Sequence, residues 1–245
     1  MQNMKGKGMK TSNKILLAVS IVPFIIVLIM ILSWKNMLDK EPGTRPGDSA
    51  RSDYVKENYE FEDFDVIKAD GIWEIHLSAG DRFKVELESF DDSIKSTSVT
   101  KSGNTLILSS EKKYFPISDR PRINITMPSL SRLNLTGMYD VDISGLKDSK
   151  MSVDITGVLS LTGTDSSVED FSFSGSGIVY ADLKDMPVSN AHFDFNGMYF
   201  INMRMNGGEL SGRIKGPGKI ITKGNIINNS INVDSPGNIT QLDVR

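Results

Sequence analysis

Three aspartates, Asp140, Asp142 and Asp154, are the residues of this sequence best suited to chemistry. Clustered carboxylates bind calcium in some proteins and act as acid and base in glycosidic bond cleavage in others. Asp142 and Asp154 could lie near one another on adjacent turns of a repetitive β-structure. We favour a solvated polar face, because no lysine or arginine constellation accompanies these aspartates. The sequence therefore predicts no catalytic residue, no metal site and no cofactor.

Composition excludes several other kinds of chemistry. The chain has no cysteine and only two histidines, His76 and His192. Thiol nucleophiles and cysteine-ligated metals are therefore excluded, and two histidines are too few for a multi-histidine metal centre. Both histidines alternate with apolar neighbours, which predicts that each lies on a strand surface. The sequence also contains no nucleophile elbow, P-loop or HExxH motif.

The charge is distributed unevenly along the chain. Four of the 28 lysines and arginines lie within positions 1–14, a segment without any acid, whereas all 31 aspartates and glutamates lie beyond it. An acidic body without a basic stripe is a poor partner for phosphate backbones. We therefore exclude nucleic acid as a partner.

The segment after the lysines predicts a membrane anchor. The run from Ile15 to Leu32 is uncharged and long enough to cross a bilayer as a helix, and Trp34 follows where an interfacial aromatic residue would lie. A cleaved signal peptide is the alternative, but its apolar core is usually shorter and the flanking residues here make a poor cleavage site. The leading lysines place the N-terminus in the cytoplasm, and both alternatives export the body of the chain.

These features divide the chain into four predicted parts. A polar run with prolines and glycines follows the apolar segment and is typical of a flexible tether. The parts are a basic cytoplasmic tail at 1–14, a transmembrane anchor at 15–34, a flexible linker at 35–60 and an extracytoplasmic domain at 61–245.

Short alternating segments predict that this domain is all-β. Trp73–Leu77, Phe83–Leu87 and Ile123–Met127 each alternate apolar and polar residues, and Gly, Asn, Asp and Ser separate such segments. No segment after the anchor has the apolar periodicity of an amphipathic helix.

A sequence repeat occurs in the second half of the chain. Its members are Gly137, Gly157, Gly175, Gly197, Gly216 and Ser235. Apolar residues occur two positions before and four positions after each member. The sequence therefore predicts a right-handed parallel β-helix of roughly 20-residue turns with a glycine at each corner. An antiparallel β-sandwich is the alternative, because alternation does not distinguish parallel from antiparallel pairing.

The tripeptide Gly-Met-Tyr occurs twice in this repeat and includes Tyr139 and Tyr199. We expect these tyrosines to pack within the domain, and an exposed ligand-binding stripe is the alternative.

Several segments resemble the putative auto-transporter adhesin, head GIN domain family. They are Phe64–Gly80, Gly103–Leu108, Ile125–Leu133 and Gly216–Ile220, and together they span about residues 61–245. The resemblance implies a β-helix domain of the bacterial cell envelope, often behind a single N-terminal membrane or export segment. It supplies no catalytic residues. The two Gly-Met-Tyr tripeptides depart from the Gly-x-Gly corners seen at Gly175 and Gly216.

The sequence thus predicts a membrane-tethered, extracytoplasmic, adhesin-like module that presents its surface to an envelope glycan or protein. The surface candidates are Tyr139, Tyr199, Asp140, Asp142 and Asp154. Two alternatives stay open, a polysaccharide lyase or hydrolase that uses the three aspartates and a sensory ectodomain that works with a membrane partner. Exposed end strands also give a reason to expect a homo-oligomer.

Overall fold

A computed structural model describes residues 54–90, 94–111, 120–234 and 238–242. The predicted tail, the predicted anchor from Ile15 to Leu32 with Trp34, and the predicted linker up to residue 53 lie outside the described residues. Within the described ranges, no helix is long and apolar enough to cross a membrane. The first strand begins at Tyr54, inside the segment predicted as linker.

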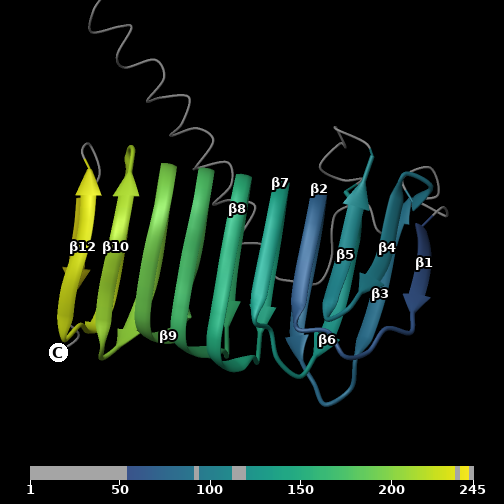
Figure 1. Cartoon of the computed structure of the whole chain (residues 1–245), viewed down its shortest axis with the longest axis horizontal. Helices are drawn as coiled ribbons and strands as arrows, with labels where there is room; N and C mark the ends of the chain where they lie inside the picture. Colours follow the sequence, from purple (N-terminus) through teal and green to yellow (C-terminus); the bar gives the residue numbers. More distant parts are fainter. Residues whose placement is uncertain (1–53, 91–93, 112–119, 235–237, 243–245) are drawn as a thin grey trace, which may run out of the picture. The chain divides into compact units, whose positions relative to one another are not determined.

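The described part of the chain is all-β, and 13 strands form one sheet (Figure 1). The strands are β1 (Tyr54–Tyr59), β2 (Val66–Ala79), β3 (Lys84–Phe90), β4 (Thr97–Ser102), β5 (Thr105–Ser110), β6 (Arg122–Met127), β7 (Arg132–Ser144), β8 (Lys147–Thr164), β9 (Ser167–Asn206), β10 (Glu209–Lys215), β11 (Gly218–Asn225), β12 (Asn228–Asp234) and β13 (Asn238–Leu242).

Pairing in this sheet is mixed. Strands β2, β7, β8, β9, β10 and β12 pair in that order, all in parallel, and β11 is parallel to both β9 and β13. Residues of β7 pair with the residues one repeat later in β8, and residues of β8 pair with those one repeat later in β9. Leu133 thus lies opposite Val153, and Val153 lies opposite Phe173. By contrast, β1 with β3, β3 with β6, and β4 with β5 are antiparallel.

The predicted fold class is therefore wrong. A single right-handed parallel β-helix would contain no antiparallel strands, whereas the observed sheet is mixed and open. The alternative, an antiparallel β-sandwich, is also wrong, because the longest strands pair in parallel. The alternation of apolar and polar residues marks a strand but does not specify its direction. A tight turn at Gly103 and Asn104 makes the β4–β5 hairpin antiparallel.

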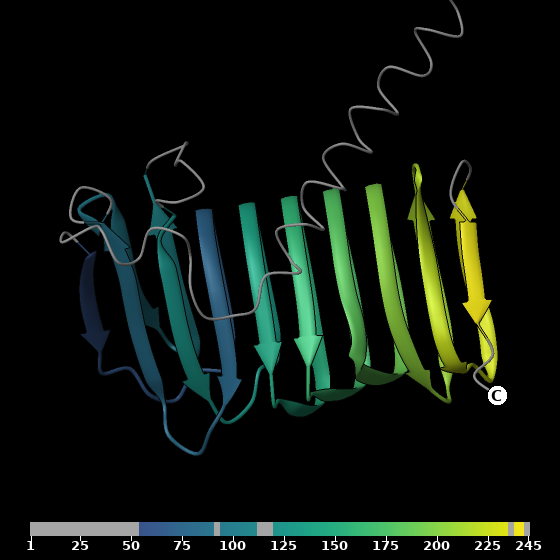
Figure 2. The ribbon, with the colours of Figure 1, turned by 180° about the vertical axis from the view of Figure 1, so that it is seen from behind.

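The long parallel strands contribute to two layers, which Figure 1 and Figure 2 show from opposite sides. A row of stacked glycines divides the long strands into two segments each. The segments that precede these glycines in the sequence, with the strands paired beside them, form what we call the first layer. The segments that follow the glycines, with the strands paired beside them, form the second layer. The stacked glycines are Gly71, Gly137, Gly157, Gly177, Gly197 and Gly216. All six have positive φ, between 105° and 156°.

The stack corrects one member of the predicted repeat. Gly157 lies opposite Gly177, whereas Gly175 lies opposite Ile155. The sequence contains glycine at both 175 and 177, so glycine spacing alone could not identify which one continues the row.

Inward side chains of the two layers form one hydrophobic core. Its largest members include Trp73 and Tyr139 in the second layer, and Phe173, Phe193 and Phe195 in the first. The ring of Phe173 lies 6.0 Å from that of Phe193 and 5.7 Å from that of Phe195, measured between centroids. These side chains fill the space between the layers and hold both outer faces in place.

The two buried tyrosines predict opposite responses to loss of the hydroxyl group. Tyr139 Oη donates to the carbonyl oxygens of Ala69 at 2.6 Å or Thr136 at 2.8 Å, and accepts from the Thr136 amide. Tyr199 Oη is buried without a hydrogen-bond partner in the described structure. We expect Tyr139→Phe to lower the free energy of unfolding by about 1–2 kcal/mol and Tyr199→Phe to leave it unchanged or raise it. Urea denaturation measures both, and equal losses would contradict the assigned contacts.

Candidate binding surface

A groove of about 950 Å³ crosses the outer face of the first layer. Its lining comes from β5, β2, β7, β8, two successive segments of β9, and β10. These segments lie side by side (Figure 1), so the groove runs across the strands rather than along them. Six intervals of about 4.8 Å between paired strands give it a length of about 29 Å.

One row of polar side chains lines this groove from β7 to β10. The row comprises Arg132, Ser152, Ser172, His192 and Ser211, one from each successive segment between β7 and β10. Arg132 Nε donates to Ser152 Oγ at 3.1 Å, and His192 Nδ1 lies 3.1 Å from Ser211 Oγ. The alternation of the strands turns these residues outward, because their neighbours fill the core.

A second row of polar side chains lies beside the first. Lys150, Asp170, Asn190 and Glu209 form it, again one per segment. Asn190 Nδ2 donates to Asp170 Oδ1 at 2.9 Å, and Asn190 Oδ1 accepts from the Glu209 amide at 3.0 Å. Lys150 Nζ lies 3.9 Å from Asp170 Oδ2. These contacts between segments orient the groups that line the groove.

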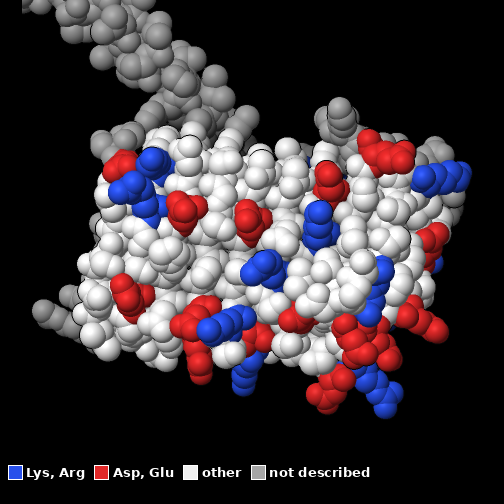
Figure 3. Space-filling view, in the orientation of Figure 1, with Lys and Arg blue, Asp and Glu red and all other residues white. Residues whose placement is uncertain are grey.

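Charges of both signs are interspersed on the face shown in Figure 3. Blue and red side chains both occur across most of it, with uncharged surface between them, and red side chains gather at the lower right. A surface of this kind has no extended field of one sign, so it does not attract a densely charged partner.

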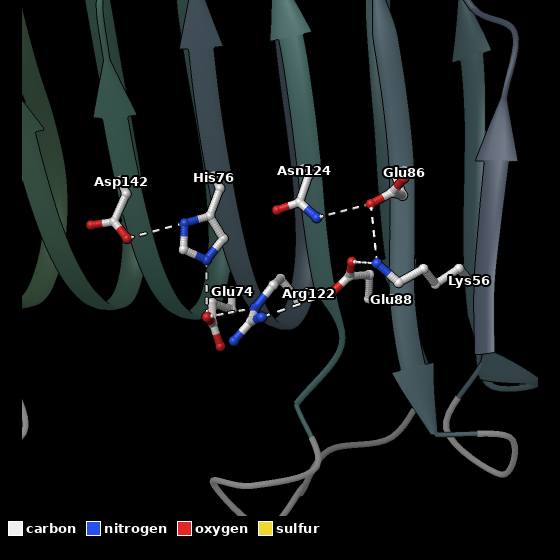
Figure 4. A network of polar contacts seen from close by, with 8 residues as sticks. All are labelled: Lys56, Glu74, His76, Glu86, Glu88, Arg122, Asn124 and Asp142. Carbon is white, nitrogen blue, oxygen red and sulfur yellow. Dashed lines mark hydrogen bonds and ion pairs between the residues drawn. The ribbon is translucent and has the colours of Figure 1, made fainter. Parts of the chain in front are cut away.

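The outer face of the second layer carries a chain of ion pairs (Figure 4). Lys56 of β1 contacts Glu88 of β3, and Arg122 Nη1 of β6 lies 3.7 Å from Glu88 Oε2. Arg122 Nε also donates to Glu74 Oε1 of β2 at 2.9 Å. Arg122 thus contacts two carboxylates whose side chains are only 12% and 10% exposed. These contacts tie the antiparallel strands to the parallel ones.

His76 extends the same chain towards β7. Its Nε2 lies 2.9 Å from Glu74 Oε1, and its Nδ1 lies 3.2 Å from Asp142 Oδ2. Burial lowers the pKa of His76, but hydrogen bonds to Asp142 and Glu74 outweigh it and raise the pKa to about 9. His76 is therefore a cation at neutral pH and joins two carboxylates.

This raised pKa predicts a pH dependence of stability. The stabilisation by protonated His76 is complete below pH 6.5, its ordinary pKa, and is lost as the pH rises towards about 9. His76 is partly exposed, so we expect solvent screening to limit the effect to about 1 kcal/mol. The difference in unfolding free energy between the natural protein and His76→Gln should be larger at pH 6 than at pH 10. A difference that grows with pH would contradict this arrangement.

The structure separates the three aspartates considered from the sequence. Asp140 and Asp142 lie on the second layer, whereas Asp154 precedes Gly157 and is exposed on the first layer. Asp142 lies opposite Thr162, and Asp154 lies opposite Asn134. Burial, together with the charges of Asp142 and Glu74, raises the pKa of Asp140. The expected proximity of Asp142 and Asp154 is therefore wrong.

The remaining candidates also have definite places. Tyr139 and Tyr199 are 1% and 2% exposed, so they lie in the core and do not form an exposed stripe. His76 belongs to the ion-pair chain, and His192 lines the groove. Among the described residues, no group of three or more histidine, aspartate or glutamate side chains could hold a metal ion.

Sequence reasoning missed two kinds of surface residue. It did not identify the groove residues, apart from noting His192 as a strand-surface histidine. It also missed a stack of Tyr180 on Phe200 on the second layer, with ring centroids 5.5 Å apart and planes at 5°. The available signal was that Tyr180 and Phe200 lie one repeat length apart. The repeat was aligned on Gly175 instead of Gly177, however, and this alignment gave the two aromatic residues different positions within the repeat.

Comparison with known proteins adds evidence on family and fold. The family model described as "Putative auto-transporter adhesin, head GIN domain" matches residues 63–245. No curated protein matches the chain. A crystal structure of a putative adhesin from Bacteroides fragilis is 18% identical, with a TM-score of 0.57, and the match covers 82% of this chain and all of that one.

Two further solved structures are similar. They are a putative adhesin from Parabacteroides merdae, at 14% identity and a TM-score of 0.47, and a putative lipid binding protein from Parabacteroides distasonis, at 17% and 0.46. Each match covers 78% of this chain and 97% of the other. The match at residues 63–245 takes in every strand from β2 to β13 and confirms the resemblance found in the sequence. The chain belongs to the putative auto-transporter adhesin, head GIN domain family.

Proposed function

We propose that this chain is an extracytoplasmic, adhesin-like binding module that residues 15–34 tether to a membrane. Its groove holds a linear partner without catalysis. The observation that carries this proposal is the course of the groove, which crosses successive strand segments and meets polar side chains on each segment from β7 to β10. Such a surface fits a chain-like molecule that lies across the strands.

The family supports an adhesin-like role and a location outside the cytoplasm. The Bacteroides fragilis structure, whose fold is similar, is also described as that of a putative adhesin. The lysines before residue 15 and the uncharged run that follows support a tether with the N-terminus in the cytoplasm. The groove would then face the cell envelope or the exterior.

The geometry supports a non-catalytic role better than the carbohydrate-active alternative. The carbohydrate-active alternative used Asp140, Asp142 and Asp154 together, and Asp154 lies on a different layer from the other two. Asp142 is engaged in an ion pair with His76, and Asp140 lies on the same strand beside the like charges of Asp142 and Glu74, which raise its pKa together with burial. This favours a structural role for the second-layer carboxylates.

Binding of the full chain in detergent to isolated cell-envelope material tests the proposal. Ser172 lies within the groove and is exposed, so Ser172→Trp should block the groove and lower binding at least tenfold. Ser176 is also exposed on β9 and does not line the groove, about 13 Å further along the strand. Ser176→Trp is therefore the matched control and should bind normally. Equal binding by both variants would overturn the proposal.

A further inference from the structure

We infer that the linear partner in the groove is a polysaccharide with little net charge, not a polypeptide. The inference rests on the proposed function, because it names the chemical class of the partner that the groove holds. It depends on the spacing of the groove's polar groups, on the hydrogen-bond pairing of the sheet's backbone and on the charges that line the groove.

The spacing of the polar groups fits sugars better than amino acids. Along the groove, equivalent side chains recur once per paired strand, as Arg132, Ser152 and Ser172 do. This interval is about 4.8 Å, whereas an extended polypeptide advances only about 3.3 Å per residue. A peptide would soon lose register with the groove. A linear polysaccharide advances by a whole sugar ring per unit, which is close to the interval between strands, so each unit could meet the same kind of side chain.

The backbone of the groove floor offers a peptide no hydrogen bonds. Extended peptides usually bind by adding a strand to a free sheet edge, where main-chain groups are unpaired. Segments of β2, β7, β8 and β9 under the groove already pair with a strand on each side. Only side chains are left to bind a partner there.

Those side chains suit a ligand rich in hydroxyl groups. The rows supply serine hydroxyls, the Asn190 amide, the His192 imidazole, the Arg132 guanidinium and the Asp170 carboxylate. Sugar hydroxyls both donate and accept hydrogen bonds, so they can satisfy this mixture of donors and acceptors. Two ionic groups of the second row, Lys150 and Asp170, face one another at 3.9 Å. With opposite charges side by side, a densely charged polymer would meet repulsion as well as attraction.

A length series tests this inference directly. The probes are neutral linear oligosaccharides of glucose, mannose, galactose and N-acetylglucosamine, each of two to eight units, with Thr-Ser peptides of matched length, which favour an extended backbone, for comparison. For at least one sugar series, the affinity of the full chain should rise with length and level off near six or seven units, where the groove is full. Ser172→Trp should weaken the longest bound oligosaccharide at least tenfold, and Ser176→Trp should not.

A second pair of variants covers the case in which tryptophan perturbs folding. Asn190 donates to Asp170 in the groove, and Asn202 donates to Asp182 at 3.2 Å on the second layer, in an equivalent contact between neighbouring segments. Asn190→Ala should weaken oligosaccharide binding about fivefold or more, whereas Asn202→Ala should leave it unchanged. Equal effects of the two variants would overturn the inference.

The envelope assay separates this inference from the proposed function. Periodate oxidation of the envelope's sugars should abolish binding that depends on Ser172, and protease treatment of the envelope should leave it intact. The polysaccharide assignment would be overturned if protease treatment abolished envelope binding and periodate treatment did not. It would also be overturned if none of the oligosaccharides bound. In that case binding that is still sensitive to Ser172→Trp would leave the proposed function standing, whereas binding insensitive to this variant would overturn both.

Discussion

Gly157→Ala is expected to lower the free energy of unfolding by about 4 kcal/mol. Gly157 has a φ of 135°, where side chains other than glycine are strained, and a Cβ at this position would overlap the carbonyl oxygen of Gly137. The backbone cannot move aside easily, because Gly157 pairs with Gly137 on one side and Gly177 on the other. Urea denaturation of the full chain measures the loss.

Gly103→Ala is the matched control for the backbone conformation. Gly103 also has a positive φ, 58°, but a Cβ there would have no heavy atom within 4 Å. We expect Gly103→Ala to cost about 1 kcal/mol, which reflects the strain of the backbone alone. A similar loss in both variants would show that the close approach of stacked strands is not what requires glycine at 157.

The glycine stack also shows how far sequence patterns could predict the fold. The repeat spacing correctly placed Gly137 and Gly157 at equivalent positions, because parallel strands in register repeat their sequence pattern. Gly175 was misassigned because Gly177 is also a glycine, and only the positions of the neighbouring strands distinguish the two. Strand direction was also beyond the sequence, since β3 and β6 alternate in the same way as the parallel strands but pair antiparallel.

The candidate site was harder to predict than the fold. The groove is built from side chains that lie one repeat apart and are individually ordinary, such as Ser152 and Ser172. Their common feature is that they align across neighbouring strands. This alignment can be recognised in a sequence only when every member of the repeat has been assigned correctly. The aspartates attracted attention through their residue type, but Asp142 and Asp154 fall on opposite sides of a glycine bend. Residue type alone therefore suggested a grouping that the fold divides between two layers.

Arg122→Met is expected to lower the free energy of unfolding by about 3 kcal/mol at pH 7. Methionine keeps much of the apolar volume of the arginine stem but removes the charge that lies 2.9 Å from Glu74 and 3.7 Å from Glu88. Both carboxylates are largely buried, so a lost cation leaves negative charge in a poorly solvated place. Urea denaturation measures the loss, which the remaining contacts of His76 with Glu74 and of Lys56 with Glu88 would compensate only in part.

Arg132→Met separates this effect from the general cost of replacing an arginine. Arg132 is exposed on the first layer, and its Nε donates to a serine hydroxyl, Ser152 Oγ, at 3.1 Å. Its replacement should cost less than about 0.5 kcal/mol, because solvent still surrounds the groups left behind. Adding Glu88→Gln to Arg122→Met should recover part of the stability, since it removes one of the two largely buried carboxylates that Arg122 contacted, and the Lys56 left behind is exposed to solvent. A double variant no more stable than Arg122→Met alone would contradict a role for charge at this position. The packing of the Arg122 stem, and not its ion pairs, would then hold the antiparallel strands against the parallel ones.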